Sequence, residues 1–230
     1  MDASLEAKQI TGPEINPAVW GILEIPNTPG PHPGVILLTG SSGWKTAYPE
    51  IAKSLSASGF IALAVDYLAE TGYEPSSENQ LKYWPIWQAI VRNAVTYLRG
   101  NPSVSRCGIG LVGYSLGAFL AVSIASTLQD VGAVVDFFGG GSSTNETLEA
   151  EVRNFPPLLI LHGEADSIVP VSYAYRLQDA VIAQGGDVEI HIYPGAEHAF
   201  NAPWSPWFSA NEASDSLSRM ISFLSKRLNG

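Results

Sequence analysis

The chain has 230 residues, a mass of 24.5 kDa and a formal net charge of −10 at pH 7. Apolar residues make up 46% of the chain and charged residues 15%, which favours a packed globule and excludes a disordered chain. The negative charge disfavours nucleic acids and anionic membrane surfaces as partners, because both would be repelled.

Targeting segments and cysteine content limit the class of protein further. No apolar run approaches the roughly 20 residues that span a bilayer, and the N-terminus lacks the basic and apolar regions of a secretory signal. Cys107 is the only cysteine, which excludes an intramolecular disulfide and a cysteine-rich metal site. We therefore expect a cytoplasmic protein with a single domain over residues 1–230, present as a monomer or a weak homodimer.

Predicted strands and helices alternate along the chain. Short apolar runs predict strands at residues 19–25, 34–38, 60–65, 107–112, 133–138, 157–161 and 188–193. Apolar residues at helical spacing predict helices at residues 46–58, 81–98, 116–128, 171–183 and 211–228, with a polar loop from residue 66 to residue 80. Such βαβ units predict an α/β fold, with a mainly parallel, twisted sheet of about seven or eight strands and helices on both faces. Functional residues then lie at the carboxyl ends of the strands.

Residues 113–117 read Gly-Tyr-Ser-Leu-Gly between a predicted strand and a predicted helix. In this G-x-S-x-G pattern the serine lies on a sharp turn with its oxygen exposed, and the glycines avoid clashes where strand and helix cross. Ser115 would also lie at a helix N-terminus, where backbone N–H groups favour a developing negative charge. A serine that only caps the helix is the alternative for the pentapeptide alone. The flanking strand and helix favour Ser115 as a nucleophile.

A serine nucleophile needs a base and an orienting carboxylate, which in hydrolases of this kind follow the serine as Asp or Glu and then His. Asp166 and His198 lie in the loops that follow the last two predicted strands. Both loops begin at the carboxyl ends of parallel strands, so we predict Ser115, Asp166 and His198 as the catalytic residues.

Other candidates for the acid and base are weaker. Glu164 and Glu197 compete with Asp166 as the carboxylate, and Asp136 lies one strand earlier, within an apolar run. His162 ends its strand before the acid loop and is interpreted as a structural hydrogen-bonding residue near the site. No H-E-x-x-H or comparable spacing of metal ligands occurs, so we expect neither a metal ion nor another cofactor.

An oxyanion hole requires two backbone donors. The first is predicted to be the N–H of Leu116, directly after the nucleophile. The second is expected in residues 39–43, Thr-Gly-Ser-Ser-Gly, whose small side chains let the backbone approach a substrate. Ser41 is the predicted donor, with Ser42 as the neighbouring alternative.

Together these segments resemble the dienelactone hydrolase family of α/β-hydrolases. The resemblance covers nearly the whole chain from about Val19. It rests on the G-Y-S-L-G elbow, the H-G-x-x-D-x-x-V-P segment at residues 162–170 and the G-A-x-H-A-F segment at residues 195–200. It implies an α/β-hydrolase fold and the roles given above for the serine, the aspartate and the histidine. It also implies that Ser41 takes the family's backbone donor position.

Three positions depart from the family pattern. The typical family nucleophile is a cysteine, where this chain has Ser115, and the typical glutamate that helps to activate the thiol is replaced by Gly40. The two changes together indicate a native serine hydrolase that needs no thiol activation. The family's arginine four residues after the histidine, implied to hold the substrate carboxylate, is Ala202 here. These departures point away from an anionic dienelactone and toward a neutral ester or lactone.

Aromatic residues are frequent near the predicted active edge of the sheet. We predict that Trp84, Phe138, Phe200 and Trp204 line an aromatic acyl or alcohol pocket, with packing in the core as the alternative. Residues 139–156 are too few for a large cap domain. We therefore expect no cap and an open site suited to small substrates.

The sequence therefore predicts a serine hydrolase that cleaves small carboxylic esters or lactones through an acyl-enzyme. Residues 39–43 and the Ala-Ser-Gly-Phe segment at residues 57–60 also resemble acyl-CoA thioesterases of this fold. A thioesterase would need basic groups for the CoA phosphates, and the chain has only 12 lysines and arginines. A non-catalytic protein that binds a small ligand is the alternative of a different class.

Overall fold

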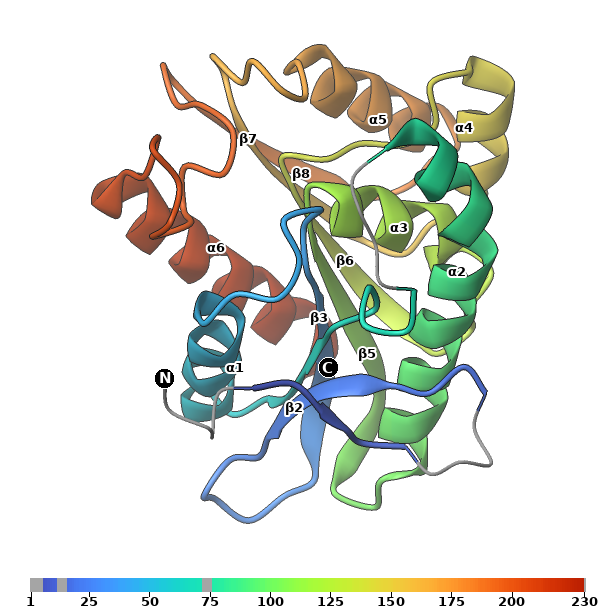
Figure 1. The fold of residues 1–230 in the computed structure, drawn as a ribbon, viewed down its shortest axis with the longest axis vertical. Coiled ribbons are helices and arrows are strands. Elements are labelled where there is room, and N and C mark those ends of the chain that lie inside the picture. Colours follow the sequence, from blue (N-terminus) through green and yellow to red (C-terminus); the bar gives the residue numbers. More distant parts are fainter. Residues whose placement is uncertain (1–5, 12–15, 72–75, 230) are drawn as a thin grey trace.

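The computed structural model describes residues 6–11, 16–71 and 76–229 (Figure 1). The extreme N-terminal residues 1–5 and residues 72–75 of the predicted polar loop lie outside this part. None of the helices in these ranges combines the length and the apolar character that a membrane span requires.

The described residues form one eight-stranded sheet with the strand order β1-β2-β4-β3-β5-β6-β7-β8. The strands are β1 (Lys8–Gln9), β2 (Trp20–Glu24), β3 (His32–Leu38), β4 (Ile61–Val65), β5 (Val104–Tyr114), β6 (Val131–Phe137), β7 (Leu158–Gly163) and β8 (Val188–Tyr193). Neighbouring strands pair in parallel from β4 to β8 in this order. Strand β2 pairs antiparallel with both of its neighbours, β1 and β4. The predicted α/β-hydrolase fold with a mainly parallel sheet is therefore confirmed.

Within the described ranges, six helices connect or follow the strands. They are α1 (Ala47–Ala57), α2 (Ser77–Gly100), α3 (Leu116–Ala125), α4 (Asn145–Glu151), α5 (Ser172–Ala183) and α6 (Ala210–Leu228). Helix α2 begins four residues before the predicted start, because the Ser76 hydroxyl accepts the N–H of Asn79 at 3.1 Å and caps the helix there. Residues 139–156 contain only the seven-residue α4, so within the described ranges this connection builds no cap.

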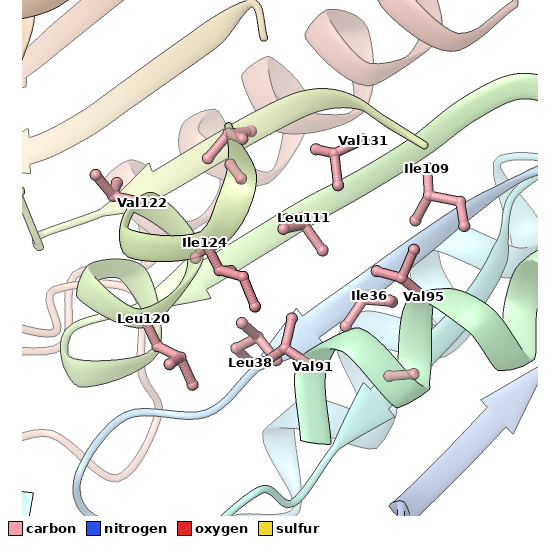
Figure 2. Packing of buried hydrophobic residues seen from close by; sticks show 14 of the residues in the cluster. Ile36, Leu38, Val91, Val95, Ile109, Leu111, Leu120, Val122, Ile124 and Val131 are labelled. Carbon is pink, nitrogen blue, oxygen red and sulfur yellow. The ribbon is translucent and has the colours of Figure 1, made fainter. Parts of the chain in front are cut away.

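The helices cover both faces of the sheet, with α1 and α6 on one face and α2 and α3 on the other (Figure 1). Side chains of strand β3 contact the helices on both faces of the sheet, because successive side chains of a strand point to opposite faces. Ile36 and Leu38 pack toward α2 and α3, while Val35 and Leu37 pack toward α1 and α6. Figure 2 shows the first of these layers, where Ile36 and Leu38 lie near Val91 of α2. This double burial explains the continuous apolar run of the strand.

Candidate active site

Ser115 lies at the sharp turn between β5 and α3. Its φ of 52° and ψ of −117° place a non-glycine residue in a region that such residues rarely adopt. A Cβ at Gly113 would lie 2.3 Å from the carbonyl oxygen of Gly117, and a Cβ at Gly117 would lie 2.5 Å from that of Leu38. Both glycines are therefore required by close backbone approach, as the pentapeptide predicts.

The His198 ring lies between Ser115 and Asp166. Its Nε2 is 3.0 Å from the Ser115 Oγ, and its Nδ1 is 2.7 Å from the Asp166 Oδ2. An ionised carboxylate only accepts hydrogen bonds, so the Nδ1 carries the proton and donates to Asp166. The Nε2 is then left as an acceptor for the Ser115 hydroxyl. The structure thus brings the three predicted residues into one hydrogen-bonded chain.

Asp166 is held by the loop that follows β7. Its Oδ1 accepts the backbone N–H groups of Ile168 and Val169 at 2.9 and 2.7 Å, and its side chain is fully buried. The buried His162 Nε2 donates to the Val169 carbonyl at 2.8 Å and lies 3.4 Å from the Asp166 Oδ2. Burial lowers the pKa of His162 and favours its neutral form. His162 therefore fastens the acid loop to the end of β7.

Two glutamates near Asp166 have other partners. Glu197 accepts the backbone N–H and the hydroxyl of Ser167, both at 2.9 Å, and these hydrogen bonds lower the pKa of Glu197. Glu164 accepts the N–H of Gly195 at 3.1 Å. Both carboxylates therefore tie the acid loop and the base loop together, while Asp166 faces the His198 ring.

Asp136, the remaining rival, is buried near the end of β6. Its Oδ1 accepts the N–H of Gly139 at 2.8 Å, whereas its Oδ2 has no hydrogen-bond partner among the described residues. Burial raises the pKa of Asp136 to about 7. The carboxyl is bound to its own turn rather than to the histidine.

The loop at residues 39–43 is fastened beside the nucleophile by two tyrosines. The Tyr67 hydroxyl donates to the carbonyl of Thr39 at 2.8 Å, and the Tyr48 hydroxyl accepts the N–H of Gly40 at 2.9 Å. Because Tyr48 occupies the N–H of Gly40, a donor for a substrate has to come from another residue of the loop. This leaves Ser41 and Ser42 as the predicted alternatives.

Two cavities meet at Ser115 and Ser41. One, which we name the small cavity, has a volume of about 210 Å³ and also contacts His198. Its aromatic lining residues are Tyr48, Tyr114, Phe138, Trp204 and Trp207. The other, which we name the large cavity, has a volume of about 610 Å³ and also contacts Leu116. Its aromatic lining residues are Trp84, Phe119 and Tyr173.

The predicted pocket residues are divided between these cavities. Phe138 and Trp204 line the small cavity, and Trp84 lines the large one. Phe200 lines neither cavity, which corrects the prediction. Its side chain is fully buried behind Phe138, with 5.7 Å between the ring centroids. Sequence reasoning missed Tyr48, a residue of α1 that lies beside the site through its contacts with Gly40 and Tyr114.

The arrangement is suited to nucleophilic catalysis by a hydroxyl group. A proton can pass from the Ser115 Oγ to the His198 Nε2 over 3.0 Å, and Asp166 faces the opposite ring nitrogen. The backbone N–H of Leu116 begins α3 directly beside the serine, where helix N-termini favour negative charge.

Comparisons with known proteins support a hydrolase. The sequence model of the dienelactone hydrolase family matches residues 19–228. Acyl-coenzyme A thioesterase 1 of Rattus norvegicus is 33% identical over 147 residues, which are 64% of this chain and 33% of the thioesterase. The chain thus spans about a third of the length of that relative.

Two further proteins match along most of the chain. A Yersinia pestis protein that carries carboxymethylenebutenolidase as a provisional name is 25% identical over 211 residues, covering 86% of this chain and 79% of that protein. The crystal structure of a dienelactone hydrolase-like promiscuous phosphotriesterase from metagenomic libraries superposes with a TM-score of 0.80 at 21% identity. That superposition covers 96% of this chain and 98% of the other, and it shows a shared fold.

Proposed function

Because the chain belongs to the dienelactone hydrolase family, we propose that it is a carboxylic ester hydrolase with Ser115 as nucleophile, His198 as base and Asp166 as orienting acid. The observation that carries this proposal is the hydrogen-bonded chain from Ser115 through His198 to Asp166, with distances of 3.0 and 2.7 Å. The substrate class is small, neutral esters or lactones.

The reaction follows from the positions of these groups. The Ser115 Oγ attacks the carbonyl carbon while its proton passes to the His198 Nε2. The resulting oxyanion accepts hydrogen bonds from the N–H groups of Leu116 and Ser41. The C–O bond then breaks, and the alcohol leaves with the proton held by His198. Asp166 stabilises the imidazolium during this step.

Water completes the cycle. It loses a proton to His198 and attacks the acyl-serine, and the collapse of the second tetrahedral intermediate returns that proton to Ser115. The products are a carboxylic acid and an alcohol. For a lactone they are the two ends of one hydroxy acid.

The lining of the site supports a neutral substrate. Lysine and arginine are absent from the described residues that line the two cavities, and Ala202 stands in the small cavity where the family typically has an arginine. A substrate carboxylate would therefore lack a cationic partner there. The overall charge of −10 would add a repulsive field.

The identity of 33% to an acyl-coenzyme A thioesterase makes a thioesterase the second candidate. The two functions are separated by comparing butyryl-CoA with S-ethyl thiobutyrate, which share the acyl group and the thioester bond. Recognition of the CoA moiety would raise kcat/KM for butyryl-CoA well above that for S-ethyl thiobutyrate. We expect no such preference, because the cavity lining offers no basic groups for the phosphates.

The proposed function is tested with Ser115→Ala and a fluorophosphonate probe. The substitution is expected to lower kcat for p-nitrophenyl acetate by at least roughly 10⁴-fold, because it removes the nucleophile. The unmodified protein should be labelled by the probe at Ser115, and a circular dichroism spectrum should show that the variant is folded. Retained activity in the folded variant would refute the assignment. A folded protein that the probe does not label would instead support a non-catalytic binding protein.

A further inference from the structure

Apart from Ser41 and Ser115, the two cavities share none of their described lining residues. Both are lined by Ser41 and Ser115, so the reacting carbonyl carbon would lie where they meet. The two substituents of that carbon, the acyl chain and the alkoxy group, must then extend in different directions. Each cavity can receive one of them.

The position of His198 decides which substituent enters which cavity. In the proposed mechanism its Nε2 gives a proton to the oxygen of the departing alcohol, so this oxygen must lie next to the ring. The His198 ring lines the small cavity and is absent from the described lining of the large cavity. The alkoxy group therefore extends along the small cavity.

The sizes and linings of the cavities differ as well. The large cavity, at about 610 Å³, lies within the range of pockets that enclose drug-sized ligands, and the small cavity, at about 210 Å³, lies below it. The wall of the large cavity includes the apolar side chains of Trp84, Phe119 and Ile168. Its wall also contains Glu151, which accepts hydrogen bonds from Ser142. Arg176 donates to the carbonyls of Ser142 and Ser143 in the same wall, so the charge of Glu151 is offset and the wall favours an uncharged acyl group.

We propose that the ester binds in one orientation, with its acyl group in the large cavity beside Leu116 and its alcohol in the small cavity beside His198. Within the class of small, neutral substrates, the preferred ones are then esters whose acyl group is larger than their alcohol group. This inference rests on the proposed function and specifies the substrate class for that site. It also disfavours CoA as a leaving group, because a long nucleotide-bearing group would have to extend from the small cavity.

The test uses two isomeric esters, methyl 2-naphthylacetate and 2-naphthylmethyl acetate. Both release a primary alcohol, and they differ in which side of the ester carries the bulky ring. We expect kcat/KM to be about tenfold higher for methyl 2-naphthylacetate, since the naphthyl group then enters the large cavity. Equal values or the reverse preference would overturn the proposed orientation.

Two variants act on one cavity each. Trp204→Ala enlarges the small cavity and should shift the kcat/KM ratio about fivefold or more toward 2-naphthylmethyl acetate. Ile168→Trp narrows the large cavity and should lower kcat/KM for methyl 2-naphthylacetate about tenfold. Both side chains are partly exposed, at 40% and 60%, so the fold should tolerate either change. Shifts in the opposite direction would contradict the orientation.

A control variant and the serine variant complete the design. Ile182→Ala changes an exposed residue of α5 outside the linings of both cavities and should leave the ratio unchanged. Ser115→Ala separates the two proposals. If it hydrolyses both esters like the unmodified protein, the proposed function itself fails. If hydrolysis depends on Ser115 but the preference is reversed, only the orientation fails.

Discussion

Two buried aspartates near the carboxyl ends of neighbouring strands have very different surroundings. Asp166, after β7, accepts two backbone N–H groups and the His198 Nδ1–H. Asp136, near the end of β6, accepts the N–H of Gly139 through one oxygen, and the other oxygen has no partner among the described residues. Burial raises the pKa of Asp136 to about 7. Both side chains are buried, so their hydrogen-bond partners, rather than burial, decide which carboxylate can serve a histidine.

Among the substitutions of these carboxylates, removing the charge of Asp166 should have the largest effect on catalytic activity. In Asp166→Asn the amide cannot stabilise an imidazolium and can favour the wrong tautomer of His198, so kcat for p-nitrophenyl acetate should fall by roughly 10³–10⁴-fold. Circular dichroism should show the same fold. A loss of less than about tenfold would mean that Asp166 does not orient the base.

Asp136 should affect stability more than activity. Its native pKa of about 7 exceeds the ordinary value of 3.8, so unfolding releases a proton between these pH values and the free energy of unfolding falls as pH rises. The raised pKa corresponds to a decrease of roughly 4 kcal/mol in the free energy of unfolding across this pH range. In Asp136→Asn this position does not titrate. The free energy of unfolding of the variant minus that of the unmodified protein should therefore increase by about this amount from pH 4 to pH 8.

Urea unfolding of both proteins at several pH values measures the effect of Asp136. A difference in unfolding free energy that is constant with pH would contradict the raised pKa. The activity of Asp136→Asn provides the control for the comparison with Asp166. It should stay within about fivefold of the unmodified protein, because Asp136 is bound to its own turn.

The smallest effect on activity is expected from a substitution of Glu197, which lies next to His198 in the sequence. Its carboxylate bonds to Ser167 and to the backbone of His198 and leaves the imidazole to Asp166. Glu197→Gln should therefore keep kcat/KM for p-nitrophenyl acetate within about threefold. A loss comparable to that of Asp166→Asn would show that the choice between the two carboxylates is wrong.

The sequence predicted most of the sheet because its central strands are buried on both faces and read as continuous apolar runs. The elements without such a pattern were missed. Strand β1 has two residues, and α4 has seven, so neither is long enough to show a periodic pattern. The antiparallel pairing of β2 also could not be derived from composition, because it depends on the path of the chain between strands.

The chain of three site residues could be anticipated because parallel strands place their following loops at one edge of the sheet. The lining of the cavities is harder to predict. Phe200 lies only two residues after His198, but Ala199 has a φ of 54°, and this turn accompanies the burial of the Phe200 ring. Tyr48 joins the site through the packing of α1, which no local pattern reveals.

The tryptophans of the two cavities give the protein its own optical reporters. Trp204 and Trp207 line the small cavity and are 40% and 41% exposed, so their indole rings are in contact with water. A bound alcohol group would displace this water and shift their fluorescence to shorter wavelengths. Trp87 is fully buried in the core and would contribute a constant background. Because Trp84 lines the large cavity, occupancy of either cavity could be followed in the unlabelled protein, even with compounds that are never cleaved.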